Sequence, residues 1–196
     1  LSRAEEYCPC DDGQALRKAE QEAENTEWFA QTERLRIRTW ANANIPLRFR
    51  EMRFETSPLA KSHPKLIALL QSPQLPDDDT DGRAMDAWRK RYDLWQGSWF
   101  LHGPFGTGKT GLAVSLAYSR MIETELGEIL FTTVPAMLSE LRSTYGRQRE
   151  DAPTEAEVIR KYAQAGQLIM DDIGAEQVKD TGWVEDRLYQ IIGERH

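Results

Sequence analysis

The sequence predicts an α/β protein, in which a parallel sheet is covered by helices on both faces and a helical arm precedes it. Three observations predict this fold. From residue 98 onward, short apolar runs alternate with longer stretches of helical periodicity. A glycine-rich loop separates the first apolar run from the first of these helices. Strands that alternate with helices pair in parallel, because each helix carries the chain back across the sheet.

The first half of the chain is predicted to be a helical arm followed by irregular structure. Residues 11–43 are rich in charge, and glycine and proline are absent between positions 14 and 45, which predicts one long helix. Residues 46–82 contain five prolines and are expected to be irregular, apart from a short helix over 65–71. A further helix is predicted over 83–96.

Three strands and four helices are predicted in the second half. The strands are expected over residues 98–102, 129–134 and 167–171, where apolar and β-preferring residues gather. The helices are expected over 109–125, from Pro135 to about residue 145, over 154–165 and over 183–194. Pro135 suits the first turn of a helix, and Thr154 with Glu157 forms the pattern of a capping box.

The glycine-rich loop has the pattern of a phosphate-binding loop. Residues 103–110, GPFGTGKT, match G-x-x-x-x-G-K-[ST] in full. Glycines let main-chain N–H groups approach phosphate, and the N-terminus of the next helix attracts the anion. Lys109 would act on the β- and γ-phosphates, and the Thr110 hydroxyl would ligate Mg²⁺. The competing interpretation is a glycine-rich turn with an incidental Lys–Thr pair. The predicted nucleotide-binding residues are Gly103, Pro104, Phe105, Gly106, Thr107, Gly108, Lys109, Thr110 and Gly111.

An acidic pair ends the last predicted strand, as a nucleotide-hydrolysing site requires. Asp171 and Asp172 follow the apolar run at 168–170. Asp171 would hold Mg²⁺ through water, and Asp172 would orient or deprotonate the attacking water. Lys109 and Asp172 are therefore the candidate catalytic residues. Alone, two acids at a strand end could equally cap the strand before Gly174, but the phosphate loop favours the functional interpretation.

Several segments together resemble the DnaC/IstB-like family of AAA+ ATPases. They are IPLRFREMRFE (45–55), GPFGTGKT (103–110), FTTVPAMLSELR (131–142), LIMDDIGAE (168–176) and WVEDRLYQIIGERH (183–196). The resemblance implies a P-loop NTPase sheet of AAA+ type, with residues 1–44 as an N-terminal segment and 45–196 as a partial ATP-binding domain. Many AAA+ proteins have Glu where Asp172 stands.

The resemblance also implies an activity and partners. It implies binding of ATP and Mg²⁺, ATP hydrolysis, assembly into a homo-oligomer, contact with single-stranded DNA, and delivery of a replicative helicase in DNA replication. A transposition helper ATPase of the same family is an open alternative. Two further alternatives are a P-loop phosphotransferase for small molecules and an interaction module with a structural nucleotide.

The chain is expected to be incomplete, because it begins with Leu1 and ends on an apolar helix. The polar sensor residue and the arginine finger of the family would lie beyond residue 196, so weak hydrolysis is expected from this chain. In relatives a cysteine-rich zinc module often precedes the ATPase domain. Cys8 and Cys10 would be its last two ligands, but structural zinc usually has four, so no bound zinc is expected.

Composition and charge narrow the remaining possibilities. The net charge is −7 and the mean hydropathy −0.63, with no apolar run long enough to cross a membrane and no secretory signal, which favours the cytoplasm. Two basic regions could nevertheless contact DNA, or simply be solvated: the arginines between residues 34 and 53, and Arg142, Arg147 and Arg149 around Tyr145. The segment DDDTDG (77–82) matches the start of an EF-hand loop, but Trp88 stands where the last ligand should be, and an acidic surface turn is the better interpretation.

Overall fold

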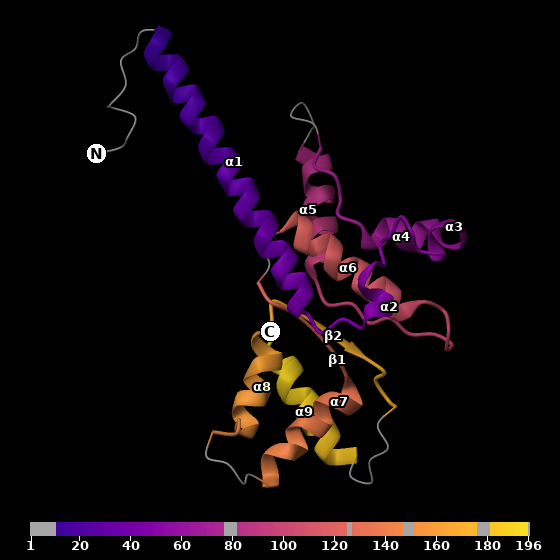
Figure 1. Cartoon of the computed structure of the whole chain (residues 1–196). Coiled ribbons are helices and arrows are strands. Elements are labelled where there is room, and N and C mark those ends of the chain that lie inside the picture. Colours follow the sequence, from indigo (N-terminus) through magenta and orange to yellow (C-terminus); the bar gives the residue numbers. More distant parts are fainter. Residues whose placement is uncertain (1–10, 77–81, 125–126, 147–150, 176–180, 196) are drawn as a thin grey trace. The chain divides into compact units, whose positions relative to one another are not determined.

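A computed structural model describes the chain except for residues 1–10, 77–81, 125–126, 147–150, 176–180 and 196. The chain divides after Arg38 into two compact units. The first holds most of helix α1, Asp11–Asn42, which confirms the predicted charged helix. The second begins at Thr39 and contains the other helices, both strands and the glycine-rich loop (Figure 1).

The second unit is mostly helical. Three short helices occupy the stretch that was expected to be irregular, and only the one over 64–70 was predicted. The predicted helices of the second half all form, within a few residues of the expected bounds. In chain order the elements are α2 (Leu47–Arg50), α3 (Leu59–Ser62), α4 (Pro64–Leu70), α5 (Gly82–Gln96), α6 (Lys109–Glu123), β1 (Ile129–Thr133), α7 (Val134–Ser143), the 3-10 turn η2 (Thr144–Gly146), α8 (Glu155–Gln164), β2 (Gln167–Asp171) and α9 (Thr181–Gly193).

Strands β1 and β2 form a parallel pair, as predicted. Ile129 lies beside Gln167 at one end and Thr133 beside Asp171 at the other. Successive side chains of a strand point to opposite faces. Ile129 therefore packs with α6, whereas its neighbour Leu130 packs with α7, α8 and α9. Helices cover both faces of this pair (Figure 1).

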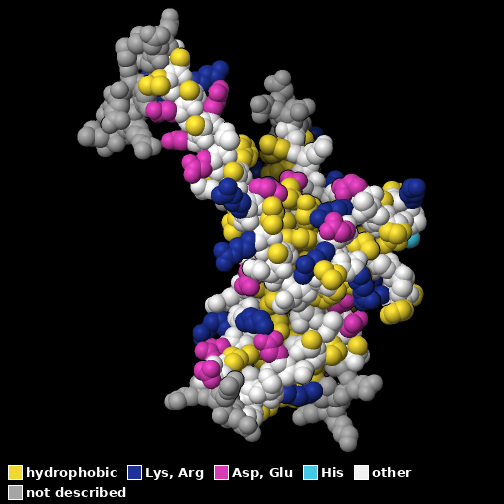
Figure 2. Space-filling view, in the orientation of Figure 1, with side chains coloured by type: hydrophobic (Ala, Val, Ile, Leu, Met, Phe, Trp, Pro, Cys, Tyr) yellow, Lys and Arg dark blue, Asp and Glu magenta, His cyan; other side chains and the backbone are white. Residues whose placement is uncertain are grey.

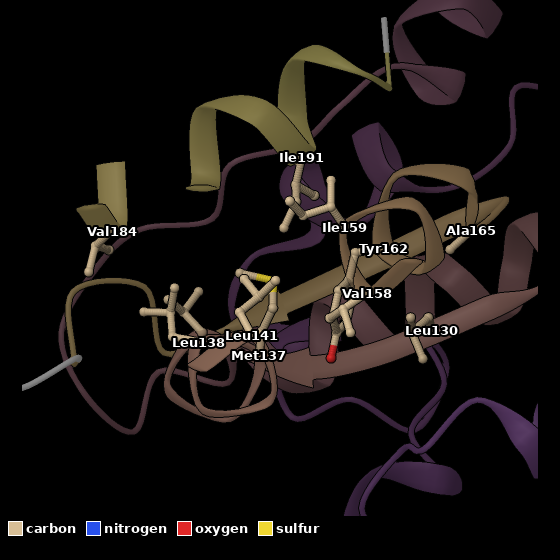
Figure 3. Packing of buried hydrophobic residues seen from close by; sticks show 11 residues of the cluster. Leu130, Met137, Leu138, Leu141, Val158, Ile159, Tyr162, Ala165, Val184 and Ile191 are labelled. Carbon is tan, nitrogen blue, oxygen red and sulfur yellow. The ribbon is translucent and has the colours of Figure 1, made fainter. Parts of the chain in front are cut away.

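The face covered by α7, α8 and α9 has a closely packed apolar core. Met137, Leu138 and Leu141 project from α7 and are at most 1% exposed. Figure 3 shows them packed with other buried residues of the cluster, among them Val158 on α8 and Ile191 on α9. Burial of these side chains is the main source of stability on this face.

Two helices begin with side-chain caps, and the sequence predicts the second of them. The Thr133 hydroxyl accepts a hydrogen bond from the main-chain N–H of Ala136 at 3.3 Å, so α7 starts directly at the end of β1. At α8, the Thr154 hydroxyl accepts from the N–H of Glu157, whose carboxylate accepts from the N–H of Thr154 at 2.7 Å. This reciprocal pair is the predicted capping box.

The predicted strand over residues 98–102 is not formed. The segment has no regular secondary structure, and Trp99 and Leu101 are part-buried against the cluster around Trp95, while Phe100 is 72% exposed. Its side chains thus alternate as in a strand. A strand, however, also needs a neighbour to accept and donate its main-chain hydrogen bonds. Among the described residues, β1 and β2 pair only with each other.

Candidate phosphate-binding site

The glycine-rich loop leads into the N-terminus of α6. Gly106 and Gly108 have φ angles of 78° and 84°, a region that other residues adopt only with strain. Gly108 is the N-cap of α6, and its carbonyl accepts the hydrogen bond from the N–H of Leu112. The loop therefore delivers the first N–H groups of a 15-residue helix to one exposed point. Such a helix N-terminus favours a bound anion.

The Lys109 side chain folds back onto this loop. Its Nζ donates to the carbonyl oxygens of Gly103 at 3.0 Å and Pro104 at 2.8 Å. The Thr107 hydroxyl also donates to the carbonyl of Pro104, at 2.9 Å. The ammonium group is thus held over the loop, where its charge adds to that of the helix N-terminus. A phosphate placed against the loop would meet this cation directly.

The end of β2 meets the start of α6 through a side-chain hydrogen bond. The Thr110 hydroxyl donates to Oδ2 of Asp171 at 2.8 Å, although the two residues are 61 positions apart. Thr110 occupies the first turn of α6, and Asp171 is the last residue of β2. Both side chains are partly buried. The sequence predicts that these two residues act on one metal ion, and the structure brings them together.

Asp172 lies one position beyond the strand and is exposed. Its φ angle is 56°, so it stands in the left-handed region, which Asp tolerates better than most residues. Its carbonyl accepts a hydrogen bond from the N–H of Ala175 at 3.1 Å, which closes a turn. Within the described part of the chain, no hydrogen bond joins the Asp172 side chain to the loop. The structure therefore places Asp172 next to the site without showing its predicted role.

Two residues behind the loop were not predicted from the sequence. A Cβ added to Gly108 would lie 3.2 Å from Cδ1 of Leu59, and one added to Gly111 would lie 3.7 Å from Sδ of Met52. The first residue of α3 thus packs against the end of the loop, and Met52, which precedes α3, packs against the first turn of α6. The available signal was the pair of glycines three positions apart, which leaves room on one side of the helix.

The segment over 43–54 is tied to the sheet and to α6. The N–H of Phe131 on β1 donates to the carbonyl of Ala43 at 2.8 Å. The guanidinium of Arg53 lies 3.3 Å from the centre of the Tyr118 ring and donates to the carbonyl of Met52. Arg50 donates to the carbonyl of Ile45. Two arginines of the predicted basic cluster thus have partners inside the chain.

The basic region after β1 also has internal partners. Arg142 lies 4.7 Å from the centre of the Trp183 ring. Trp183 donates to the hydroxyl of Tyr145, which donates to Glu155. Arg147 and Arg149 lie outside the described residues, as do Cys8, Cys10 and the acidic segment 77–81. Contact of this region with DNA remains a prediction.

The residues present suit a magnesium–nucleotide complex. A hydroxyl that donates its proton to a carboxylate keeps its lone pairs for a cation, and hard oxygen ligands are those that Mg²⁺ prefers. Within the described residues, no three His, Cys, Asp or Glu side chains gather in one place. Mg²⁺ would therefore be held by Thr110 and Asp171 together with phosphate oxygens, and Lys109 would offset the remaining negative charge.

A separate cavity of about 690 Å³ lies away from the loop. Its walls include Arg53, Trp88 and Tyr118, and no residue of 103–111 contributes to them. It is therefore not the phosphate site.

In the described part of the chain, no helix has the length and apolar character to span a bilayer.

The chain is similar in sequence to part of a curated protein. No family model matches the chain, and no solved structure matches it. The relative, from Mycobacterium tuberculosis (strain ATCC 25618 / H37Rv), is named "Putative ATP-binding protein Rv3427c in insertion sequence". It is 31% identical over 95 residues, which make up 48% of this chain. The match spans only 34% of the length of that relative.

Proposed function

We infer that this chain binds Mg–ATP at the loop over 103–111 and belongs to an ATPase of the DnaC/IstB-like AAA+ family. The hydrogen bond between Thr110 and Asp171 carries the inference. A glycine-rich turn with an incidental Lys–Thr pair has no reason to place its hydroxyl against an acid at the end of a parallel strand. A metal-dependent phosphate site requires that arrangement.

Each residue has a separate task in this proposal. The loop N–H groups and Lys109 bind the phosphates, and Thr110 with Asp171 holds Mg²⁺, which neutralises charge during transfer of the γ-phosphoryl group. Asp172 orients or deprotonates the attacking water. What supports this role is that Asp172 directly follows the last residue of β2 and is exposed, so its carboxylate is accessible to a ligand.

Two processes on DNA fit such an ATPase. The resemblance leads first to a loader of a replicative helicase that contacts single-stranded DNA and acts as a homo-oligomer. The name of the relative instead favours a helper ATPase in transposition, because that protein is described as part of an insertion sequence. A small-molecule phosphotransferase is the alternative from another class. It would bind ATP without any response to DNA.

The binding test uses a fluorescent ATP analogue, with Mg²⁺ and with EDTA. Lys109→Ala should weaken binding at least 10-fold in either condition, because it removes a cation that acts on phosphate directly. Thr110→Val and Asp171→Asn should weaken binding in Mg²⁺ but change little in EDTA. Thr110→Ser, which keeps the hydroxyl, should bind as the wild type does. Lys90→Ala is the charge control, because Lys90 is an exposed cation on α5, away from the loop.

The outcomes separate the proposals. Equal loss for Thr110→Val with and without Mg²⁺ would mean that the hydroxyl has no role toward the metal. Wild-type binding by Lys109→Ala would overturn the phosphate site itself. Addition of single-stranded DNA should tighten nucleotide binding or raise hydrolysis. Indifference to DNA, with intact Mg–ATP binding, would favour the phosphotransferase.

A further inference from the structure

Helix α1 carries a side-chain pattern that the ATP site does not explain. Positions spaced alternately three and four residues apart lie along one side of a helix and form the seam of a coiled coil. On α1 one such row has a single charge in an otherwise heavily charged helix. It comprises Lys18, Gln21, Asn25, Trp28, Thr32 and Leu35. The two large apolar residues of this row, Trp28 and Leu35, are 51% and 64% exposed.

The charges beside this row change sign along the helix. Glu22 and Glu24 flank its first half, and Arg36 and Arg38 flank its second half. Phe29, at the midpoint, is 65% exposed. Figure 2 shows acidic side chains along the middle of the arm, with basic ones on both sides of them. Between residues 22 and 38, the charges that flank the row are thus complementary to their own reverse.

We propose that α1 pairs with α1 of a second copy of this chain as an antiparallel coiled coil centred near Phe29. A two-fold interface requires that when residue i contacts j, j also contacts i. With Asn25 opposite Leu35 and Trp28 opposite Thr32, the four central positions of the row obey this rule.

The same register aligns the charges that flank the seam. Glu22 then lies opposite Arg36, and Glu24 opposite Arg38. Each contact occurs twice in the two-fold pair, which gives four ion pairs that flank Trp28 and Phe29 of the two chains. Flanking charges of this kind set the orientation of coiled coils.

A parallel pair uses the same residues poorly. It sets Lys18 against its own copy in the seam and leaves Arg36 and Arg38 without facing acids. The intrahelical contacts of the flanking residues do not oppose the antiparallel pair. Glu22 lies 4.0 Å from Lys18, and Arg36 lies 3.9 Å from Glu33. Exposed contacts of this kind contribute little to stability.

Charge reversal on the 196-residue chain tests the pairing. Sedimentation should show the wild type as a dimer of the 22.5 kDa chain, with an affinity that weakens in high salt. Glu22→Arg with Glu24→Arg, and separately Arg36→Glu with Arg38→Glu, should weaken the dimer roughly 100-fold, because four attractions become repulsions. Mixing the two variants should restore a 1:1 dimer, as should all four changes in one chain.

The control matched to the first variant is Glu20→Arg with Glu27→Arg, which makes the same change of net charge outside the seam and should leave the dimer intact. Circular dichroism confirms that each variant remains helical. A wild type that stays monomeric at about 100 μM overturns the proposal, as does a failure of the mixed variants to associate.

Cross-linking fixes the orientation. In a Cys8→Ser, Cys10→Ser background, Phe29→Cys should link to its own copy through a short thiol-reactive linker, and Lys18→Cys should not. The reverse result would mean a parallel pair. Because none of these residues belongs to the loop, nucleotide binding can succeed or fail independently of this test.

Discussion

The two faces of the β1–β2 pair are built from different kinds of contact. On the α7–α9 face, apolar packing is reinforced by polar side chains that have partners on neighbouring helices. Glu140 of α7 accepts from Lys161 of α8 at 2.7 Å and from the hydroxyl of Tyr162, and Glu155 lies 2.7 Å from Arg187 of α9. The α6 face ends instead in an exposed loop. Among the described residues, Thr110 is the side chain of 103–111 that bonds to β2, through its hydroxyl to Asp171.

The difference assigns separate tasks to the two faces. Buried, multiply bonded helices make a rigid support, and reactive groups must stay accessible to a ligand. Arg195 illustrates the supporting side, because its guanidinium donates to the carbonyls of Tyr162, Ala163 and Ala165 at the end of α8. Burial lowers the pKa of Arg195. Changes on the α7–α9 face should therefore alter stability, and changes at the loop should alter binding.

The largest expected effect on stability is from Leu141→Ala. Leu141 is fully buried in the cluster of Figure 3, so truncation leaves a cavity and should lower the free energy of unfolding by about 2–5 kcal/mol. Denaturant titration measures the loss. Leu47→Ala is the control, because Leu47 is 79% exposed and its truncation should change stability by less than about 0.5 kcal/mol. Nucleotide affinity of the folded fraction should be unchanged in both. A loss of affinity in Leu141→Ala would show that the faces are coupled.

The next largest effect on stability should appear when glycines of the loop are replaced by alanine, and it should have opposite signs at Gly108 and Gly111. Gly108→Ala puts a side chain at a φ of 84° and should destabilise the protein by roughly 1–2 kcal/mol and impair nucleotide binding. Gly111 lies within α6, and a Cβ there makes only ordinary contact with Met52. Gly111→Ala should therefore raise stability by about 0.5–1 kcal/mol. Thermal unfolding of both variants decides the matter, and equal shifts would refute the assignment of strain to Gly108.

The sequence predicted these two faces unequally well. Periodicity located β1, β2 and the helices around them, because amphipathic patterns report burial on one side. The capping pattern at Thr154 and the loop at 103–110 were also readable, since each depends on residues close together in the chain. The sequence predicted that Thr110 and Asp171 act on the same metal ion, because both residue types are ligands of Mg²⁺. In the structure Asp171 ends the paired strand β2, and it accepts a hydrogen bond from Thr110.

What the sequence did not predict depends on partners distant in the chain. Residues 98–102 have the alternation of a strand, but no neighbouring strand bonds to them among the described residues. Leu59 and Met52 reach the underside of the loop from a proline-containing stretch with no periodicity. Local pattern reports which side of an element is buried, and it does not report what covers that side.

A smaller loss is expected at the start of α8. Thr154→Ala removes the hydroxyl that accepts from the N–H of Glu157 and should lower stability by about 1 kcal/mol. Thr154→Ser keeps the acceptor and should stay close to the wild type. Chemical denaturation with unchanged cooperativity measures the difference. An equal loss in the serine variant would point to the Thr154 methyl group, and not to the cap, as the source.

The smallest effect should be a pH dependence on the supporting face. Burial alone raises the pKa of Glu140, but hydrogen bonds from Lys161 and Tyr162, with the charge of Lys161, outweigh it and hold that pKa below its usual 4.5. The resulting stability is fully present above pH 4.5 and is lost as the pH falls through the folded-state pKa. Because the Glu140 side chain is 34% exposed, its contribution to the free energy of unfolding should be only a few tenths of a kcal/mol. Glu140→Gln should flatten this part of the acid-unfolding curve, whereas Glu185→Gln, on the exposed side of α9, should leave it in place. A curve of unchanged slope in Glu140→Gln would mean that Lys161 and Tyr162 hold α7 to α8 without help from the charge.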